Sequence, residues 1–91
     1  MSLFQLGQLV ATPGAIQLMQ DTNTTSWSLF SRHMNGDWGC VCKDDAKANN
    51  DSIKDGLRIL SVYKLGPYQT KVYVITEADR SSTCILLPSE Y

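Results

Sequence analysis

The sequence predicts an α+β domain in which about three N-terminal helices pack on a C-terminal antiparallel sheet of three or four strands. Helix-like segments occupy residues 13–55, apolar alternation with a period of two starts near residue 57, and turn-forming residues separate the alternating segments. With 91 residues, 43% of them hydrophobic, the chain has the length and apolar content of a single domain, 1–91.

The N-terminal segment predicts an extended stretch followed by a helix. Residues 6–11 are mostly apolar and are expected to form a short strand or extended segment. Thr12 is a favourable N-cap and Pro13 suits the first helical position, so a helix should span 13–20. The side chains expected to face the core from this helix are Ile16, Leu18 and Met19.

Two further helices are predicted before the sheet. In 26–34, capped by Thr25 or Ser26, apolar residues recur at helical spacing, and Asn35-Gly36 should end the helix. The segment 43–55 has an acidic first turn and is followed by Gly56, as the helix dipole and a left-handed C-terminal residue favour. The expected apolar positions are Trp27, Phe30 and Met34 in the former, and Ala46, Ala48 and Ile53 in the latter.

The C-terminal third predicts three strands, at 57–65, 70–77 and 83–87. Gly66-Pro67 starts the first turn, residues 78–82 form the second, and Pro88 closes the last strand. This last strand is expected at the sheet edge, where it could pair with a second copy of the chain. The inward row of the first strand is expected to be Leu57, Ile59, Ser61, Tyr63 and Leu65.

Charge and composition exclude several classes of function. The net charge is −1 and the eight basic residues are scattered, so avid nucleic-acid binding is not favoured, although a local basic patch could form. No apolar run reaches the length of a membrane span, and the N-terminus lacks the pattern of a signal peptide. Three cysteines, an odd number, favour a reducing compartment. We therefore expect a cytoplasmic protein without a membrane partner.

The segment RHMNGDWG (32–39) holds the only histidine and is the first candidate site. His33 could act as a general acid or base, or it could bond to Asp37 or to its own helix end. Asp37 lies between Gly36 and Gly39 and suits a turn in which its side chain bonds the backbone. Trp38 could stack on a ligand ring or fill the core beside the sheet.

The segment TEADRSST (76–83) is the second candidate site. Its charged and hydroxyl groups could hold a phosphate, or they could form a plain hairpin turn in which Asp79 bonds the backbone and Arg80 pairs with Glu77 or Asp79. If His33 met Glu77 and Arg80 across the sheet, with Arg58 nearby, they would form a base, an acid and a phosphate clamp. The catalytic candidates are His33, Glu77 and Arg80. The binding candidates are Arg32, Asp37, Trp38, Arg58, Thr76, Asp79 and Thr83.

No metal or cofactor is expected. Cys40-x-Cys42 lacks the usual spacing of a zinc knuckle, and Cys84 alternates within an apolar strand. Glycine-rich nucleotide loops, nucleophile elbows and metalloprotease motifs do not occur in the sequence.

Several motifs resemble a family of small proteins carried on bacterial plasmids, integrative elements and gene cassettes. They are LGQLVATPGA near the start, RHMNGDWG in the middle, and RILSVY followed by VITEADRSSTCILLPSEY at the end. The resemblance implies a setting of mobile DNA in a bacterial cytoplasm and no reaction. A more distant, architectural similarity is to ribonucleases of the barnase/RelE type, which place helices ahead of an antiparallel sheet.

These observations favour a small protein encoded by a mobile element that acts as a non-catalytic interaction or adaptor module, through a protein partner or self-association. The alternative is a ribonuclease-like enzyme, or a degenerate relative, that uses His33, Glu77 and Arg80. A DNA-mimic role is a third reading, because acidic residues gather in 44–55, although nine acidic residues are few for a mimic.

Overall fold

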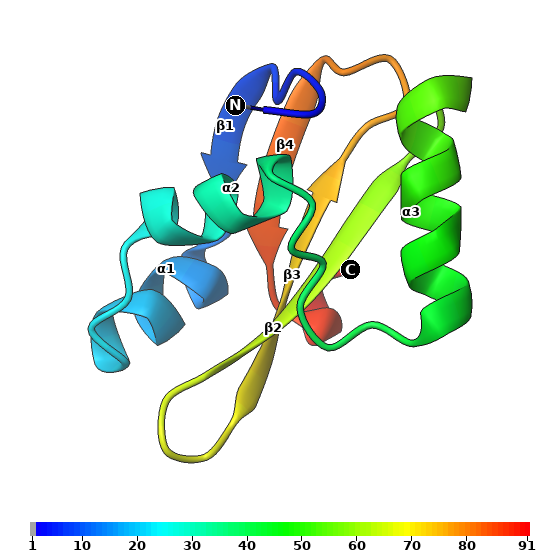
Figure 1. The fold of residues 1–91 in the computed structure, drawn as a ribbon. Helices are drawn as coiled ribbons and strands as arrows, with labels where there is room; N and C mark the ends of the chain where they lie inside the picture. Colours follow the sequence, from blue (N-terminus) through cyan, green and yellow to red (C-terminus); the bar gives the residue numbers. More distant parts are fainter. Residues whose placement is uncertain (1) are drawn as a thin grey trace.

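The fold is of the α+β class: three helices follow the first strand of the sheet and precede its other three strands. A computed structural model describes residues 2–91. The elements in chain order are strand β1 (Gln8–Ala11), helices α1 (Pro13–Asp21), α2 (Ser26–Met34) and α3 (Lys43–Asp55), strands β2 (Ile59–Leu65), β3 (Thr70–Thr76) and β4 (Ser82–Leu86), and the short 3-10 helix η1 (Pro88–Glu90). Figure 1 shows α2 in front of the sheet, α3 beside β2, and the β2–β3 hairpin extending beyond the helices.

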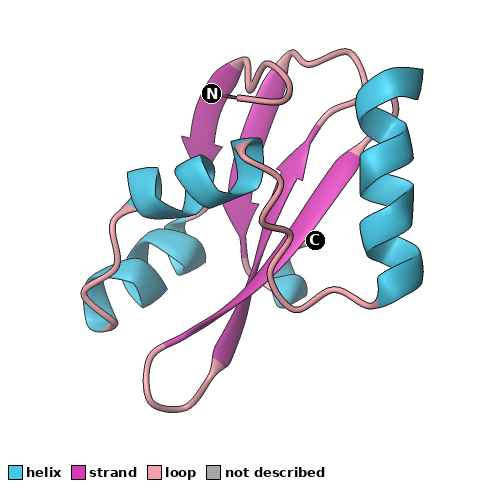
Figure 2. Cartoon of the chain, in the orientation of Figure 1, coloured by secondary structure: helices cyan, strands magenta, loops and turns pink. Residues whose placement is uncertain are grey.

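The sheet is mixed, so the expectation of an antiparallel sheet is wrong. Its strand order is β1-β4-β3-β2, and β1 runs parallel to β4, with Gln8 opposite Ser82. The other two pairs are antiparallel, and all four strands can be followed in Figure 2. β4 was expected at an edge but lies between β1 and β3. A parallel pair between the two ends of the chain leaves no turn signal in the sequence, whereas each hairpin does.

The helix ends follow the predicted caps. The Thr12 side chain accepts a hydrogen bond from the Ala15 N–H at 3.3 Å, and Thr25 caps α2 in the same way through Ser28 at 3.2 Å. Gly56 ends α3 with a left-handed φ of +68°. These local rules therefore account for the starts of α1 and α2 and for the end of α3, whereas α3 begins after Cys42 without a side-chain cap.

The main core lies between the sheet and helices α1 and α2. The phase of α2 differs from the prediction, because Trp27 is 57% exposed and Leu29 and His33 point inward with Phe30. In α1, Met19 is buried as expected but Ile16 is exposed. Three apolar residues at helical spacing indicate a helix but do not determine which face of it is buried. Contact with the sheet determines that face. The buried residues of this core are Ala15, Met19, Leu29, Phe30, Tyr63, Leu65, Val72, Val74 and Ile85.

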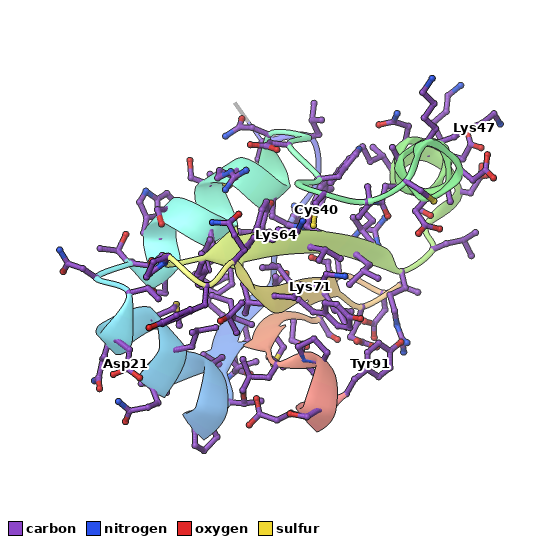
Figure 3. All side chains as sticks on the ribbon, turned by 90° about the horizontal axis from the view of Figure 1, so that it is seen from below. Asp21, Cys40, Lys47, Lys64, Lys71 and Tyr91 are labelled. Atoms are coloured by element: carbon purple, nitrogen blue, oxygen red, sulfur yellow. The ribbon has the colours of Figure 1, made fainter. Side chains whose placement is uncertain are left out.

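A second, smaller core forms under α3. Phe4, Trp38 and Ile59 are buried there, with Ala46 and Ile53 of α3 packed against them. Ala48, expected on the same helix face, is exposed, and so is Leu57, expected on the inward row of β2. Figure 3 shows Lys47 pointing from α3 away from the sheet. No helix within residues 2–91 is both long and apolar enough to cross a membrane.

Candidate functional site

Arg32 and Asp37 close the loop that follows α2. The Arg32 Nε–Asp37 Oδ2 distance is 2.7 Å, and the Arg32 guanidinium lies over the Tyr63 ring, 4.3 Å from its centroid. Asp37 Oδ1 accepts a hydrogen bond from the Gly39 N–H at 3.1 Å, which confirms the predicted turn. The bond from Arg32 lowers the pKa of Asp37. Both side chains are about half exposed and already paired, so they brace the loop.

Trp38 is buried in the second core, which confirms the prediction that it fills the core beside the sheet. Its ring stacks on Phe4 with a centroid distance of 6.2 Å and meets the His33 ring edge-on at 5.9 Å. Its Nε1–H donates to Asn50 Oδ1 of α3 at 3.2 Å. Trp38 thus joins the loop to α3 and forms one wall around the histidine.

His33 is fully buried, and both of its ring nitrogens are hydrogen bonded. Nδ1 lies 2.5 Å from Ser61 Oγ, and Nε2 lies 2.9 Å from Thr76 Oγ1. The predicted bond of His33 to Asp37 or to its own helix end is therefore wrong, because its partners are Ser61 and Thr76. Phe4 meets the ring edge-on at 5.2 Å. The imidazole is therefore enclosed by two strands and two aromatic rings.

A chain of hydroxyl groups determines the tautomer of His33. The Leu6 carbonyl can only accept, and the Thr83 hydroxyl donates to it at 2.7 Å. Thr83 Oγ1 then accepts from the Thr76 hydroxyl, also at 2.7 Å, since each hydroxyl has one proton. Thr76 Oγ1 must in turn accept from Nε2–H of His33, which leaves Nδ1 to accept from Ser61. The neutral ring with its proton on Nε2 satisfies every group in the chain.

Burial keeps this imidazole neutral. Removing the ring from water disfavours its charged form and lowers its pKa from 6.5 to about 4. No carboxylate bonds to the ring to offset this effect, because its partners are hydroxyl groups. At neutral pH His33 is a structural link between α2, β2 and β3, closed to solvent.

Glu77 and Arg58 pair with each other at the other side of the sheet. The Arg58 Nη2–Glu77 Oε1 distance is 3.3 Å, and Arg58 Nη1 donates to the Tyr91 hydroxyl at 3.1 Å. Tyr91 packs edge-on against Tyr73. Glu77 therefore faces an arginine and does not meet His33.

Arg80 binds backbone carbonyl groups instead of a carboxylate. Its Nη1 donates to the Leu57 carbonyl at 2.7 Å, and its Nη2 donates to the Ser52 carbonyl near the end of α3 at 2.8 Å. The expected pairing of Arg80 with Glu77 or Asp79 is absent from the ion pairs of residues 2–91. Asp79 accepts from the Ser81 N–H at 3.0 Å, as the hairpin prediction required. This turn is thus a structural clamp on α3.

The three catalytic candidates do not form a shared site. His33 and Arg80 contact the same Phe4 ring, at 5.2 and 5.7 Å, but one is buried and neutral and the other is occupied by carbonyl groups. Glu77 is engaged with Arg58. Residues 2–91 contain no pocket and no group of three potential metal ligands, and their cysteines are unpaired.

The two edges of the sheet differ in how their backbone groups are satisfied. On β2, the Asn49 side-chain amide donates to the Leu60 carbonyl at 2.7 Å and accepts from the Leu60 N–H at 3.1 Å. The Val62 N–H donates to the Trp38 carbonyl, and the Val62 carbonyl accepts from the Cys40 N–H. The next outward residue, Lys64, is exposed and carries a charge, which protects an edge from pairing. Figure 3 labels Lys64 on this strand.

The opposite edge, formed by β1, is open. The N–H groups of Gln8 and Thr12 donate to the carbonyls of Ser81, just before β4, and of Ile85 in β4, at 2.9 and 3.0 Å, so the backbone groups of the even-numbered residues of β1 point toward β4. Leu9 and Ala11 must then direct their N–H and C=O groups away from the sheet, and within residues 2–91 no hydrogen bond reaches them. The side chains of Leu9 and Val10 are 45% and 38% exposed. Unlike the outward position of Lys64 on β2, which carries a charge, this edge combines unused backbone bonding capacity with uncharged side chains.

Two functional features escaped the sequence analysis for identifiable reasons. Ser61 stood in the inward row of β2 as a polar residue among apolar ones, which signals a buried polar partner, and that partner is His33. Asn49 is also a polar residue that is buried, on a helix with few apolar residues, and its partner is the Leu60 backbone on the edge of β2. The open edge of β1 gave none, because it depends on which strands pair.

Comparisons with protein-family models, with curated proteins and with solved structures return no match for this chain.

Proposed function

We propose that this protein is a non-catalytic protein-interaction module that receives an extended segment of a partner at the open edge of β1. The single observation behind the proposal is the contrast between the edges. On the edge of β2, the backbone groups of Leu60 and Val62 are hydrogen bonded and Lys64 carries a charge. On the edge of β1, the outward N–H and C=O groups of Leu9 and Ala11 have no partner within residues 2–91. An added strand would satisfy those groups through main-chain bonds.

The side chains of β1 support the same role. The first charged residue of the sequence is Asp21, so the edge strand itself carries no charge that would repel an incoming strand, and Glu90, which lies at the end of β1, is engaged by Thr12 and Gly14. Exposed Leu9 and Val10 offer apolar contact on the two faces of such a pair. The absence of a pocket in the described chain also suits recognition by an edge better than recognition of a small molecule.

The cellular setting that we propose is the bacterial cytoplasm, in association with mobile DNA. Its support is the resemblance of the LGQLVATPGA, RHMNGDWG and VITEADRSSTCILLPSEY segments to the mobile-element family described above. The free thiols of Cys40, Cys42 and Cys84 suit a reducing compartment.

Selection of short random peptides on the purified protein tests the proposed function. Peptides that use the edge should slow amide exchange at Leu9 and Ala11, and Val10→Lys should weaken their binding at least tenfold. Leu57→Lys is the matched control, because Leu57 is also apolar and exposed but lies two residues before β2, away from the β1 edge. Selected peptides that leave both amides unprotected, or that bind Val10→Lys normally, would contradict the proposal.

A further inference from the structure

We infer that the segment received at this edge is β1 of a second copy of the same chain, so that two sheets join into one of eight strands. This inference rests on the proposed function and names its partner. The two copies would be related by a two-fold axis and would pair β1 with β1 in the antiparallel direction, as a symmetric interface requires.

The backbone parity of β1 fixes the register of the pair. Leu9 and Ala11 direct their backbone N–H and C=O groups away from β4. These groups pair fully across the two copies when Leu9 of each copy lies opposite Ala11 of the other. Each such pair exchanges two N–H···O=C bonds, and Val10 faces its own copy at the intervening position. The alternative centred on Leu9 would need Gly7 to be extended, but Gly7 has a φ of +68°.

Self-pairing suits the chemistry of this strand. A two-fold axis brings each residue close to its own copy, so a charge near the axis would meet a like charge. Residues 8–11 are QLVA, and no charge occurs before Asp21. The Val10 side chains, 38% exposed in one copy, would meet as a β-branched pair on the face that carries Cys84.

The length of the strand limits the affinity. Pairing over four residues buries less surface than a stable dimer of standard size, so the association should be weak and dependent on concentration. The left-handed Gly7 and Pro13 frame the strand and keep the pairing from spreading along the chain.

Sedimentation equilibrium and amide exchange, measured from low to about 1 mM protein, test the inference at the weak end of specific association. As dimer forms, exchange should slow at Leu9 and Ala11, whereas Gln8 and Val10, which bond to β4, should be slow at every concentration. Val10→Lys should raise the dissociation constant at least tenfold by placing two ammonium groups on the axis, and Leu57→Lys should leave it unchanged.

The outcomes separate this inference from the proposed function. A protein that stays monomeric at the highest concentration, or a dimer that leaves the Leu9 and Ala11 amides exposed, overturns the second copy as partner. If selected peptides still protect those amides, the interaction edge stands and only its occupant is different. If no peptide protects them either, both proposals fail.

Discussion

The buried state of His33 makes the stability of the fold depend on pH. In the folded protein burial lowers the pKa of His33 to about 4, whereas the unfolded chain should titrate near the ordinary 6.5. As pH falls, the unfolded chain therefore takes up the proton first, and unfolding is favoured. The stabilisation due to the neutral ring is complete above pH 6.5 and is lost as the pH falls towards 4.

The magnitude follows from the two pKa values. One pKa unit corresponds to about 1.36 kcal/mol, so lowering the value from 6.5 to about 4 amounts to about 3.4 kcal/mol of unfolding free energy in total. About 1.8 kcal/mol of it should be lost between pH 7 and pH 5. The pKa values of Asp37, Asp79 and Glu90 are also lowered, but from ordinary values near 4, so these carboxylates act mainly below this window.

Urea unfolding at intervals from pH 7 to pH 5 measures this loss, and NMR of the ring assigns it, because His33 is the only histidine. The ring signals of the folded protein should titrate only below pH 5, with the proton on Nε2 and Nδ1 unprotonated. Tyr68→His adds a histidine at a site that is 90% exposed, and this second ring should titrate near 6.5 without adding pH dependence.

Two results would refute the reasoning about His33. A folded-state pKa near 6.5 would show that the ring is open to solvent, and a proton on Nδ1 would contradict the direction of the hydroxyl chain. His33→Gln should flatten the pH dependence between pH 7 and pH 5 even though it lowers stability at every pH.

Three further predictions concern the edge of β2, the turn at Arg80 and catalytic activity. Asn49→Ala should lower the unfolding free energy by about 1–3 kcal/mol in urea titrations, because it leaves the Leu60 backbone without its partners, and faster exchange of the Leu60 amide would identify the cause. Arg80 has a φ of +60°, so Arg80→Gly should be less destabilising than Arg80→Ala in the same assay, and equal losses would argue against backbone strain. Purified protein should not cleave RNA, and cleavage that is lost in Glu77→Gln would restore the ribonuclease hypothesis.

Local sequence signals predicted the parts of the fold that depend on neighbours in the chain. The caps at Thr12 and Thr25, the span 43–55 and the β2–β3 hairpin were correct, because capping, helix dipole and turn chemistry act over a few residues. The parallel pairing of β1 with β4 was missed because it joins the two ends of the chain. Which strands form the two edges of the sheet depends on that pairing, so the sequence alone did not reveal the open edge of β1.

The candidate site was predicted only in part, for a related reason. Within 32–39 the sequence identified the turn at Asp37 and the packing of Trp38, which depend on their immediate surroundings. It listed Thr76 and Thr83 as binding residues, and both belong to the hydroxyl chain of His33. Their role was not foreseen, because it requires knowing that α2 crosses the sheet at these positions.

Through the side-chain amide of Asn49, α3 occupies the backbone groups of Leu60 on the edge of β2. Beyond its small apolar face, α3 is attached by directed polar bonds, those of Asn49 to Leu60, of Asn50 to Trp38 and of the Ser52 carbonyl to Arg80. Elements held in this way detach at lower cost than a buried core strand. With α3 in place the edge of β2 is closed at Leu60, so the proposed pairing would use the β1 edge alone. Loss of α3 would free the N–H and C=O groups of Leu60 alone, because Val62 stays bonded to Trp38 and Cys40 and Lys64 keeps its charge. The closed edge of β2 is therefore shared between α3, which bonds Leu60, and the loop 38–40, which bonds Val62.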